Sequence, residues 1–335
     1  MKNLLLGIFT ILISLSFSFG QFTFNNLQKA LKHPLQVHIL DLYNQNLTSL
    51  PKEIYKLKNL EVLYLSNNNL SSLPEEIGQL DSLKELYINN NQLISLPKSI
   101  GNLKKLRVLS LSNNKLTYLP QSIGNLQNLR SLYLSNNFLS TLPQTINNLI
   151  NLEELGLSNN KITSLPDISN LKHLRSLLLN NNKLKFFPLS ITNISNLQEL
   201  YMNKNLIQFI PKQIQFLQNL EILSLAYNQI HDIPPEIGNL KNLKYLNLSH
   251  NDIYKLPYSF GNLINLQKLD LSNNHLSSLP KSFSNLKKCI DLNISSNNFT
   301  ILPVAIKYMS SLKALGLKNN NIQVYSIDPN KILIY

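Results

Sequence analysis

The sequence has few of the residues on which redox chemistry or metal binding usually depends. Cys289 is the only cysteine among 335 residues, so no disulfide framework or multi-thiolate zinc site can form within the chain. The six histidines are scattered, and no H-E-x-x-H, C-x-x-C, G-x-S-x-G, P-loop or G-x-G-x-x-G pattern occurs. These absences argue against a catalytic or metal site. The sequence predicts a protein that is not an enzyme and needs no cofactor.

Long apolar runs are also scarce, and the one clear case is at the N-terminus. Lys2 precedes an apolar stretch from Leu4 to Phe17, and a small-x-small sequence ends at Gly20. Residues 1–20 are therefore predicted to be a secretory signal peptide. An uncleaved anchor, a buried capping helix and the apolar tail of a cytoplasmic protein remain alternatives. No later segment has the roughly 18 apolar residues of a membrane span, so no transmembrane segment is expected after signal removal.

What the sequence has in abundance is a 23-residue repeat. Its fourth position is leucine in all thirteen copies, from Leu40 to Leu315. A fixed period of 20–29 residues is typical of a solenoid, because a unit this small cannot bury its apolar face without stacking on its neighbours. The repeat therefore predicts one continuous core and an extended surface, which favours a binding protein over an enzyme.

The second copy, Leu60 to Ser82, illustrates the repeat. Its apolar positions are 1, 4, 6, 11, 14, 18 and 21, with asparagine at position 9 and proline at position 15. Alternation around position 4 predicts a half-buried strand, and the looser spacing after it predicts an irregular or 3-10 return segment. Asparagine occupies position 9 in twelve copies and Gln45 in the first. We interpret these amides as partners for backbone groups where each strand bends.

This pattern resembles the leucine-rich repeat family, in its L-x-x-L-x-L-x-x-N-x-L-x-x-L-P-x-x-I-x-x-L form, over residues 37–322. The run from Leu27 to Leu42 resembles the N-terminal segment of exported leucine-rich repeat proteins of spirochaetes. The resemblance implies an α/β solenoid, a right-handed horseshoe with a concave parallel β-sheet of about 13 strands and mostly irregular or 3-10 convex segments. It also implies ligands that are mainly proteins.

The ends of the solenoid need covers, because a terminal repeat would otherwise expose its core. Residues 21–36 are predicted to be an N-terminal helical cap whose short helix ends before Pro34, and residues 323–335 a C-terminal cap. Twelve full repeats and one partial repeat lie between them. Cys289 takes position 1 of its repeat, where other copies have buried leucine or valine, so we interpret it as a core residue.

Tyrosines dominate the surface that the strands should present. Position 5 points onto the concave face, where Tyr64, Tyr87, Tyr133 and Tyr201 occur with Leu178 among them. At about 4.8 Å per strand this column spans about 29 Å, the length of a protein edge or an extended chain. Two interpretations remain open: contact with a ligand, or ring stacking that only stabilises the sheet. The predicted partner-binding residues are Tyr43, Tyr64, Tyr87, Arg107, Arg130, Tyr133, Leu178, Glu199, Tyr201, Tyr227 and Tyr245.

Charge separates the concave face from the rest of the surface. The concave columns and their margins have nine acidic and nine basic residues. Removing Lys2 with the signal lowers the formal charge from +13 to +12, and this excess is expected on the flanks, the convex side and the termini. A specific nucleic-acid groove would concentrate basic residues in the concavity, so none is predicted. The basic flanks are interpreted as solubilising, or as weak contacts to anionic lipid or glycan.

Three functions remain open. The first is an exported protein, secreted or at the cell surface, that holds a protein partner, such as a host surface or matrix protein, on its concave sheet. The second is a cytoplasmic signalling scaffold of the intracellular leucine-rich repeat type. The third is a glycan or lipopolysaccharide binder that uses the tyrosine column as a stacking platform. The N-terminus discriminates the first two, because export predicts a mature chain that begins at Gln21.

Overall fold

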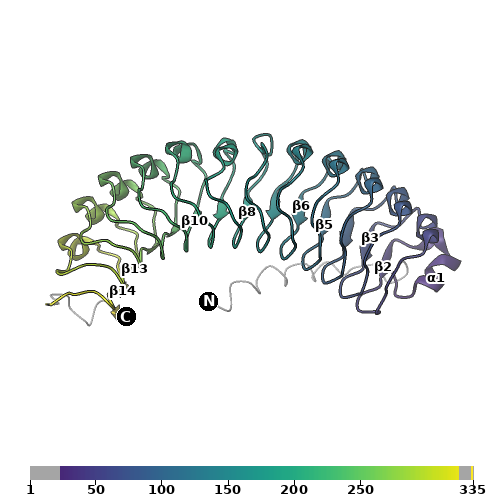
Figure 1. Ribbon diagram of the computed structural model, residues 1–335, viewed down its shortest axis with the longest axis horizontal. Helices are drawn as coiled ribbons and strands as arrows, with labels where there is room; N and C mark the ends of the chain where they lie inside the picture. The colour runs from purple at the N-terminus through teal and green to yellow at the C-terminus, as the bar shows by residue number, and fades with distance from the viewer. Residues whose placement is uncertain (1–22, 324–332, 335) are drawn as a thin grey trace.

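A computed structural model describes residues 23–323 and 333–334. The predicted signal peptide and most of the predicted C-terminal cap lie outside these residues. The described chain forms a curved solenoid, with strands lining the inner side of the arc and short helical turns following its outer side (Figure 1). No helix in the described part of the chain is long and apolar enough to cross a membrane.

The strands form one parallel sheet of fifteen members in chain order. The strands that the repeats contribute are β2 to β14, which confirms the predicted 13, and β1 and β15 extend the sheet at its two ends. The bounds are β1 Thr23–Phe24, β2 Ile39–Asp41, β3 Val62–Tyr64, β4 Glu85–Tyr87, β5 Val108–Ser110, β6 Ser131–Tyr133, β7 Glu154–Gly156, β8 Ser176–Leu178, β9 Glu199–Tyr201, β10 Ile222–Ser224, β11 Tyr245–Asn247, β12 Lys268–Asp270, β13 Asp291–Asn293, β14 Ala314–Gly316 and β15 Leu333–Ile334.

The register of the sheet follows the repeat without a slip. Leu63 of β3 pairs with Leu86 of β4, and position 4 pairs with position 4 in this way across all the repeat strands. These leucines are almost completely buried. Because side chains alternate along a strand, burying position 4 places positions 3 and 5 on the concave face. The prediction that position 5 faces the concavity is thus confirmed.

The return segments are 3-10 turns, as the sequence predicts. Proline at position 15 precedes most of them with an extended backbone; for Pro120, φ is −66° and ψ is 149°. Their bounds are Lys52–Lys56, Glu75–Gln79, Lys98–Asn102, Gln121–Asn125, Gln144–Asn148, Leu189–Asn193, Lys212–Phe216, Pro235–Asn239, Tyr258–Asn262, Lys281–Asn285 and Val304–Tyr308, and a further 3-10 helix, Pro34–Gln36, precedes β2. The one-residue-shorter sixth repeat has no 3-10 helix in its return segment, which lies wholly within the described residues.

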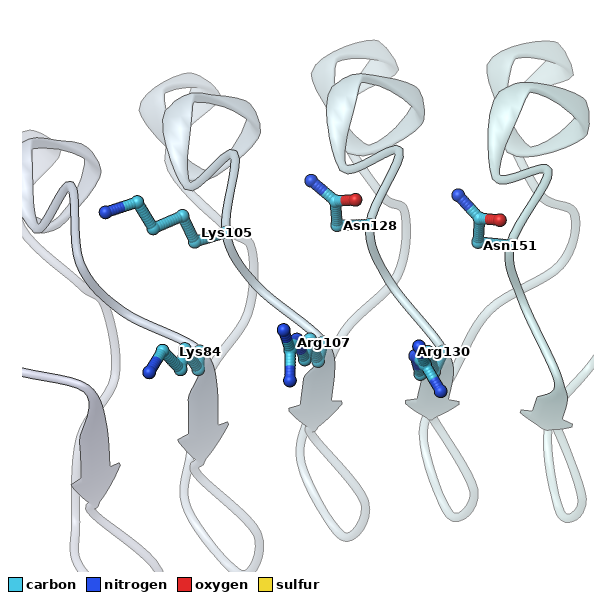
Figure 2. Close-up of a pocket in the computed structure, with 6 residues that line it drawn as sticks. All are labelled: Lys84, Lys105, Arg107, Asn128, Arg130 and Asn151. Atoms are coloured by element: carbon cyan, nitrogen blue, oxygen red, sulfur yellow. The ribbon is translucent and has the colours of Figure 1, made fainter.

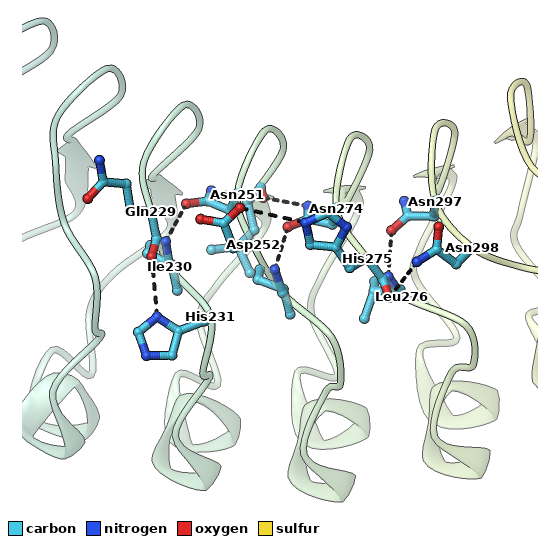
Figure 3. A network of polar contacts seen from close by, with 12 residues as sticks. Gln229, Ile230, His231, Asn251, Asp252, Asn274, His275, Leu276, Asn297 and Asn298 are labelled. Atoms are coloured by element: carbon cyan, nitrogen blue, oxygen red, sulfur yellow. Dashed lines mark hydrogen bonds and ion pairs between the residues drawn. The ribbon is translucent and has the colours of Figure 1, made fainter.

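A ladder of buried asparagines at position 9 connects the repeats. Asn137 Nδ2 donates to the carbonyl oxygens of Leu111 and Leu134 at 3.0 Å each, and its Oδ1 accepts from the Leu116 amide at 3.0 Å. All twelve asparagines donate to the preceding repeat in this way. Figure 3 shows the ladder in the C-terminal repeats. The structural interpretation of these amides is confirmed, and the reason is that buried backbone groups need partners.

Glycine at position 19 allows the convex turns to approach closely. A methyl group at Gly101 would overlap the backbone oxygen of Ser122 in the next repeat, and the same holds for Gly238 against Ser259. Five repeats use this pairing of glycine with a serine or threonine of the next turn. Close approach of neighbouring turns on the outer side lets the solenoid keep a dense core.

The N-terminal end differs from the helical cap expected over residues 21–36. Strand β1 comes first, and only then helix α1 (Leu27–Lys32), whose N-cap Asn26 accepts a hydrogen bond from the Lys29 amide at 2.9 Å. Ala30 is buried, and Leu27 and Leu31 pack against the core. Strand β1 was not predicted because a two-residue strand has no periodicity to detect.

Candidate partner-binding surface

The concave tyrosines are half-buried side chains that lie along the sheet. Tyr64 and Tyr87, on adjacent strands, stack with ring centroids 5.1 Å apart and an interplanar angle of 12°. Tyr64 is 36% exposed, and Tyr87, Tyr133 and Tyr201 are less exposed. Stacked rings stabilise the sheet, yet each keeps part of its surface open to the concavity. The Tyr64–Tyr87 pair thus shows the stacking that one interpretation requires, and all four rings keep the open surface that ligand contact would require.

Carboxylates orient two of these phenols. The hydroxyl of Tyr87 donates to Glu85 Oε2 at 2.8 Å, and that of Tyr133 donates to Glu154 on the next strand. Burial, followed by the hydrogen bond and charge of Glu154, raises the pKa of Tyr133 to about 12. Burial and the neighbouring Glu85 likewise raise the pKa of Tyr87. Both phenols are neutral at physiological pH, and each has lost rotational freedom before a ligand arrives.

The remaining predicted residues on the strands do not all occupy position 5. Tyr201 lies on β9, where burial and then the charge of Glu199 raise its pKa to about 12. Glu199 accepts a hydrogen bond from Ser176 Oγ at 3.1 Å. Leu178 is a half-buried strand residue of β8. Tyr245 stands at position 3 of β11, not position 5, and its hydroxyl accepts from Asn247 Nδ2 at 3.2 Å.

Tyr43 and Tyr227 lie beyond the ends of the strands. Tyr43 follows β2, is exposed, and accepts a hydrogen bond from Asn67 Nδ2 at 2.7 Å. Tyr227 takes position 8, where φ is positive in every repeat and asparagine is the usual residue. Asparagine is favoured there because it tolerates left-handed backbone better than most side chains. These two tyrosines therefore lie at the sheet edge, while the strand tyrosines lie across its middle.

Position 8 holds a second group of aromatic and charged side chains, of which only Tyr227 was predicted from the sequence. In three consecutive repeats it is Lys204, Tyr227 and His250. Lys204 Nζ lies 5.5 Å from the centroid of the Tyr227 ring, and the Tyr227 and His250 rings stack at 3.9 Å with an angle of 11°. The detectable signal was the loss of asparagine from position 8 in adjacent repeats.

The flank that follows the strands has its own exposed aromatic residues in the C-terminal half. Phe209 packs edge-on against His231 at 4.6 Å, and Tyr254 stacks on His275 at 4.9 Å. His275 also lies 3.6 Å from Asp252, beside the asparagine ladder drawn in Figure 3. These residues were missed because positions 10, 12 and 13, which they occupy, are polar in most repeats.

The predicted residues Arg107 and Arg130 lie at the margin of the sheet, directly before strands β5 and β6. They take position 2 of adjacent repeats, and both line a hollow with Lys84 and Lys105 (Figure 2). The even mixture of charges expected along this margin therefore does not hold locally. Lys105, at position 23, lies two residues before Arg107 in the chain, and the stacking of the repeats brings both beside Lys84 and Arg130.

Metal binding has no support in the described residues, where no three histidine, cysteine, aspartate or glutamate side chains are close enough to hold an ion. Cys289 is buried, and burial raises the pKa of its thiol to about 12. The thiol is therefore protonated at neutral pH and enclosed by the core, a poor nucleophile.

Comparison with protein families agrees with this architecture. Models of the leucine-rich repeat region match residues 9–111, 94–155 and 228–327, and a leucine-rich repeat model matches residues 127–184. The chain belongs to the leucine-rich repeat family. No curated protein matches its sequence significantly.

Several solved leucine-rich repeat structures are similar to this chain. One, from Leptospira interrogans, is 34% identical, with 92% of this chain and 95% of that chain covered and a TM-score of 0.67. An internalin of Listeria monocytogenes is 25% identical, with 85% and 88% covered and a TM-score of 0.67. These matches confirm the expected resemblance to bacterial members of the family.

A plant receptor provides a third comparison. The ectodomain of the Arabidopsis thaliana receptor kinase GASSHO1/SCHENGEN3, solved in complex with CASPARIAN STRIP INTEGRITY FACTOR 2, is 30% identical, with a TM-score of 0.71. The alignment covers 89% of this leucine-rich repeat protein but only 40% of the receptor chain. The aligned part is thus the repeat array, and the receptor chain is more than twice as long as this protein.

Proposed function

We propose that this leucine-rich repeat protein is a non-catalytic binding module that holds a protein partner on its concave sheet. The observation that carries the proposal is the row of half-buried tyrosines from Tyr64 to Tyr201, aligned by the strand register. Tyrosine is enriched at binding hot spots, because its large ring gives contact area at a low cost in conformational entropy. The plant ectodomain solved with CASPARIAN STRIP INTEGRITY FACTOR 2 supports a protein ligand by similarity.

The carboxylates that hold the tyrosine hydroxyls favour recognition of a partner as well as stability of the sheet. Tyr87 and Tyr133 are held by Glu85 and Glu154, so their rings are ordered before a partner binds. Preorganisation of this kind lowers the entropy lost on association. Half-buried rings with fixed hydroxyl groups offer a partner an apolar surface at defined positions.

The test is capture of the partner by alanine variants at Tyr87, Tyr133 and Tyr201. The native partner is first identified by crosslinking to the wild-type protein, and its binding to each purified variant is then measured by surface plasmon resonance. We expect binding to weaken at least about tenfold per substitution, as hot-spot residues require. Tyr118→Ala is the matched control, because Tyr118 is exposed on the flank, away from the concave sheet.

The proposal fails if the three variants bind as well as the control. It also fails if their binding is lost only in proportion to unfolding, measured by circular dichroism on the same samples. Tyr64 and Tyr87 stack on each other, so a loss of stability of about 1 kcal/mol is expected at Tyr87 and does not count against the proposal.

Export to the cell surface or the medium is the second part of the proposal. It is supported by the predicted signal peptide in residues 1–20 and by similarity to an internalin and to receptor ectodomains. Terminal sequencing of the native protein tests it. A mature chain starting at Gln21 supports export, whereas a retained Met1 supports the alternative, a cytoplasmic scaffold.

A glycan ligand is the competing class, since tyrosine rings can stack on sugars and the chain is basic overall. Binding to a glycan array that Tyr87→Ala and Tyr133→Ala erase would replace the protein-binding proposal. The flank lysines are proposed to make only weak contacts with anionic lipid or glycan. Retention on heparin at low salt that collapses at moderate salt would support this, and no retention at low salt would exclude it.

A further inference from the structure

Four basic side chains meet in one hollow at the margin of the concave sheet. Lys84, Arg107 and Arg130 take position 2 of three consecutive repeats, and Lys105 comes from position 23, just before β5. The hollow has a volume of about 330 Å³ and is also lined by Asn128 and Asn151. Figure 2 shows the position-2 side chains side by side at the starts of their strands, with Lys105 and the two asparagines above them.

The positive charge in this hollow is only partly neutralised. Lys84 Nζ lies 2.7 Å from Glu61 Oε2, and Arg130 Nη1 lies 3.3 Å from Glu153 Oε1. Among the described residues, Arg107 and Lys105 form no ion pair, and both are exposed. Four cations therefore share two carboxylates. Like charges one strand spacing apart, about 4.8 Å, repel each other, and an anionic ligand would relieve that repulsion.

The two glutamates also limit the length of the site. Glu61 and Glu153 take position 2 in the repeats on either side of the three basic ones. A long polyanion that followed this row would meet a carboxylate at each end, which costs binding energy. The arrangement suits a compact anionic group with one or two carboxylates better than heparin or a nucleic acid strand.

The asparagines add a second kind of recognition. Asn128 Nδ2 donates to the Lys104 carbonyl oxygen, and Asn151 Nδ2 to the Gln127 carbonyl oxygen, both at 2.8 Å. Each bond uses one of the two N–H donors of the amide and leaves the second N–H and the Oδ1 atom for a ligand. An amide that both donates and accepts matches a peptide bond, whereas the oxygens of sulfate or phosphate only accept. Cations next to such amides match an acidic stretch of polypeptide.

We propose that this hollow binds a short acidic segment of the protein partner, with one carboxylate on Arg107 and a second between Lys105 and Lys84. This rests on the proposed function, in which the partner lies on the concave sheet. Lys84 and Arg130 precede Tyr87 and Tyr133 by three residues each, or about 10 Å along a strand. A protein seated on these tyrosines can therefore reach the hollow.

Fluorescence anisotropy with labelled synthetic peptides tests the proposal on the full mature protein. The probe is a short peptide with a central Glu-Asp pair, and its partner control is the Gln-Asn version of the same peptide. We expect the acidic peptide to bind more tightly than the neutral one. Arg107→Gln should weaken its binding about tenfold or more, because a charge-assisted bond is lost, and Arg107→Lys should weaken it less.

Arg175→Gln is the matched control variant. Arg175 is also an exposed position-2 arginine, but it lies outside the hollow, so its loss changes the net charge equally and should alter binding less than about twofold. The proposal is overturned if both arginine variants weaken binding equally, if the two peptides bind alike, or if a heparin oligosaccharide binds more tightly than the acidic peptide and depends on Arg107.

The outcomes also separate this proposal from the proposed function. If Arg107→Gln leaves capture of the crosslinked partner unchanged while Tyr133→Ala abolishes it, the acidic subsite is wrong and the concave site stands. If the acidic peptide needs Arg107 but the tyrosine variants capture the partner normally, the hollow is an anion site and the concave proposal fails.

Discussion

The two halves of the concave sheet have the same backbone but different surfaces. From β3 to β9 the position-5 column carries four tyrosines, and the basic hollow lies at its margin. From β10 to β14 the same column carries Ser224, Asn247, Asp270, Asn293 and Gly316. Register, the asparagine ladder and the buried leucines continue unchanged through both halves. The rings are therefore not required for the solenoid to form.

This difference shows that the position-5 column can vary without a change in the fold. Small and polar residues occupy this column in β10 to β14, so forming the sheet does not by itself require the tyrosines of β3 to β9, which is consistent with the proposed partner recognition. In the C-terminal half Tyr227 stacks on His250 at the sheet edge, and Phe209 packs on His231 on the flank. A uniform scaffold thus presents different surfaces at its two ends.

The strongest way to test the uniformity of the scaffold is to remove one asparagine of the ladder in each half. Asn114→Ala and Asn251→Ala each lose the bonds donated to three carbonyl oxygens and one accepted bond, and leave buried backbone groups without partners. Each should lower the free energy of unfolding by about 3 kcal/mol, measured by urea denaturation. The exposed Asn102→Ala should cost less than about 0.5 kcal/mol. Unequal losses in the two halves would show that the scaffold is not uniform.

A smaller loss of stability is expected at the glycines of the convex turns. Gly101→Ala and Gly238→Ala would each push a methyl group into a serine backbone oxygen of the next repeat, at a cost of about 2 kcal/mol in thermal or urea unfolding. Gly156→Ala is the control, because the nearest atoms would lie 3.4 Å from its new methyl group. If Gly101→Ala and Gly238→Ala were as stable to unfolding as Gly156→Ala, the neighbouring turns would be able to move apart at no cost.

The half-buried tyrosines predict an alkaline loss of stability. The folded pKa of Tyr133, about 12, is above its ordinary value of 10, so the native state binds its proton more tightly. The stabilisation is complete below pH 10 and is lost as pH rises through about 12. Melting temperature should therefore fall over this interval, and less steeply in Tyr133→Phe than in wild type. Tyr258→Phe, at an exposed convex site, should leave the slope closer to that of wild type.

The smallest effect is expected for partner binding in the C-terminal half. Asn247→Ala and Asn293→Ala remove polar side chains from the same column that carries the tyrosines, but their oxygens accept bonds within their own repeats. Affinity for the crosslinked partner should change less than about twofold, while Tyr133→Ala weakens it at least about tenfold. A large loss at either asparagine would extend the binding surface across both halves.

Much of the fold could be predicted from the sequence, because each repeat contains the same local sequence pattern. Leucine at position 4, asparagine at position 9 and proline at position 15 predict the strand, its bend and the return turn, and all three appear in β3 and the segment that follows. Strand β1 escaped prediction, since two residues contain no periodicity. So did the left-handed backbone at position 8, although asparagine there was a visible signal.

The candidate site was only partly predictable. The direction of position 5 follows from strand alternation, so the tyrosine row could be predicted from Tyr64 to Tyr201. The carboxylate of Glu154 on the hydroxyl of Tyr133 depends on which side chains of adjacent strands lie within reach. That information is spread over residues 21 positions apart and has no local pattern.

The sequence by itself determined the solenoid, its register and the face that the tyrosines occupy, because a 23-residue period with alternating leucines has one way to bury its apolar side chains. Only the tertiary structure decided that Lys105 joins Lys84, Arg107 and Arg130 around one hollow. Their meeting depends on the bend before each strand and on the spacing between repeats. Both are properties of the stacked chain, and no single repeat contains them.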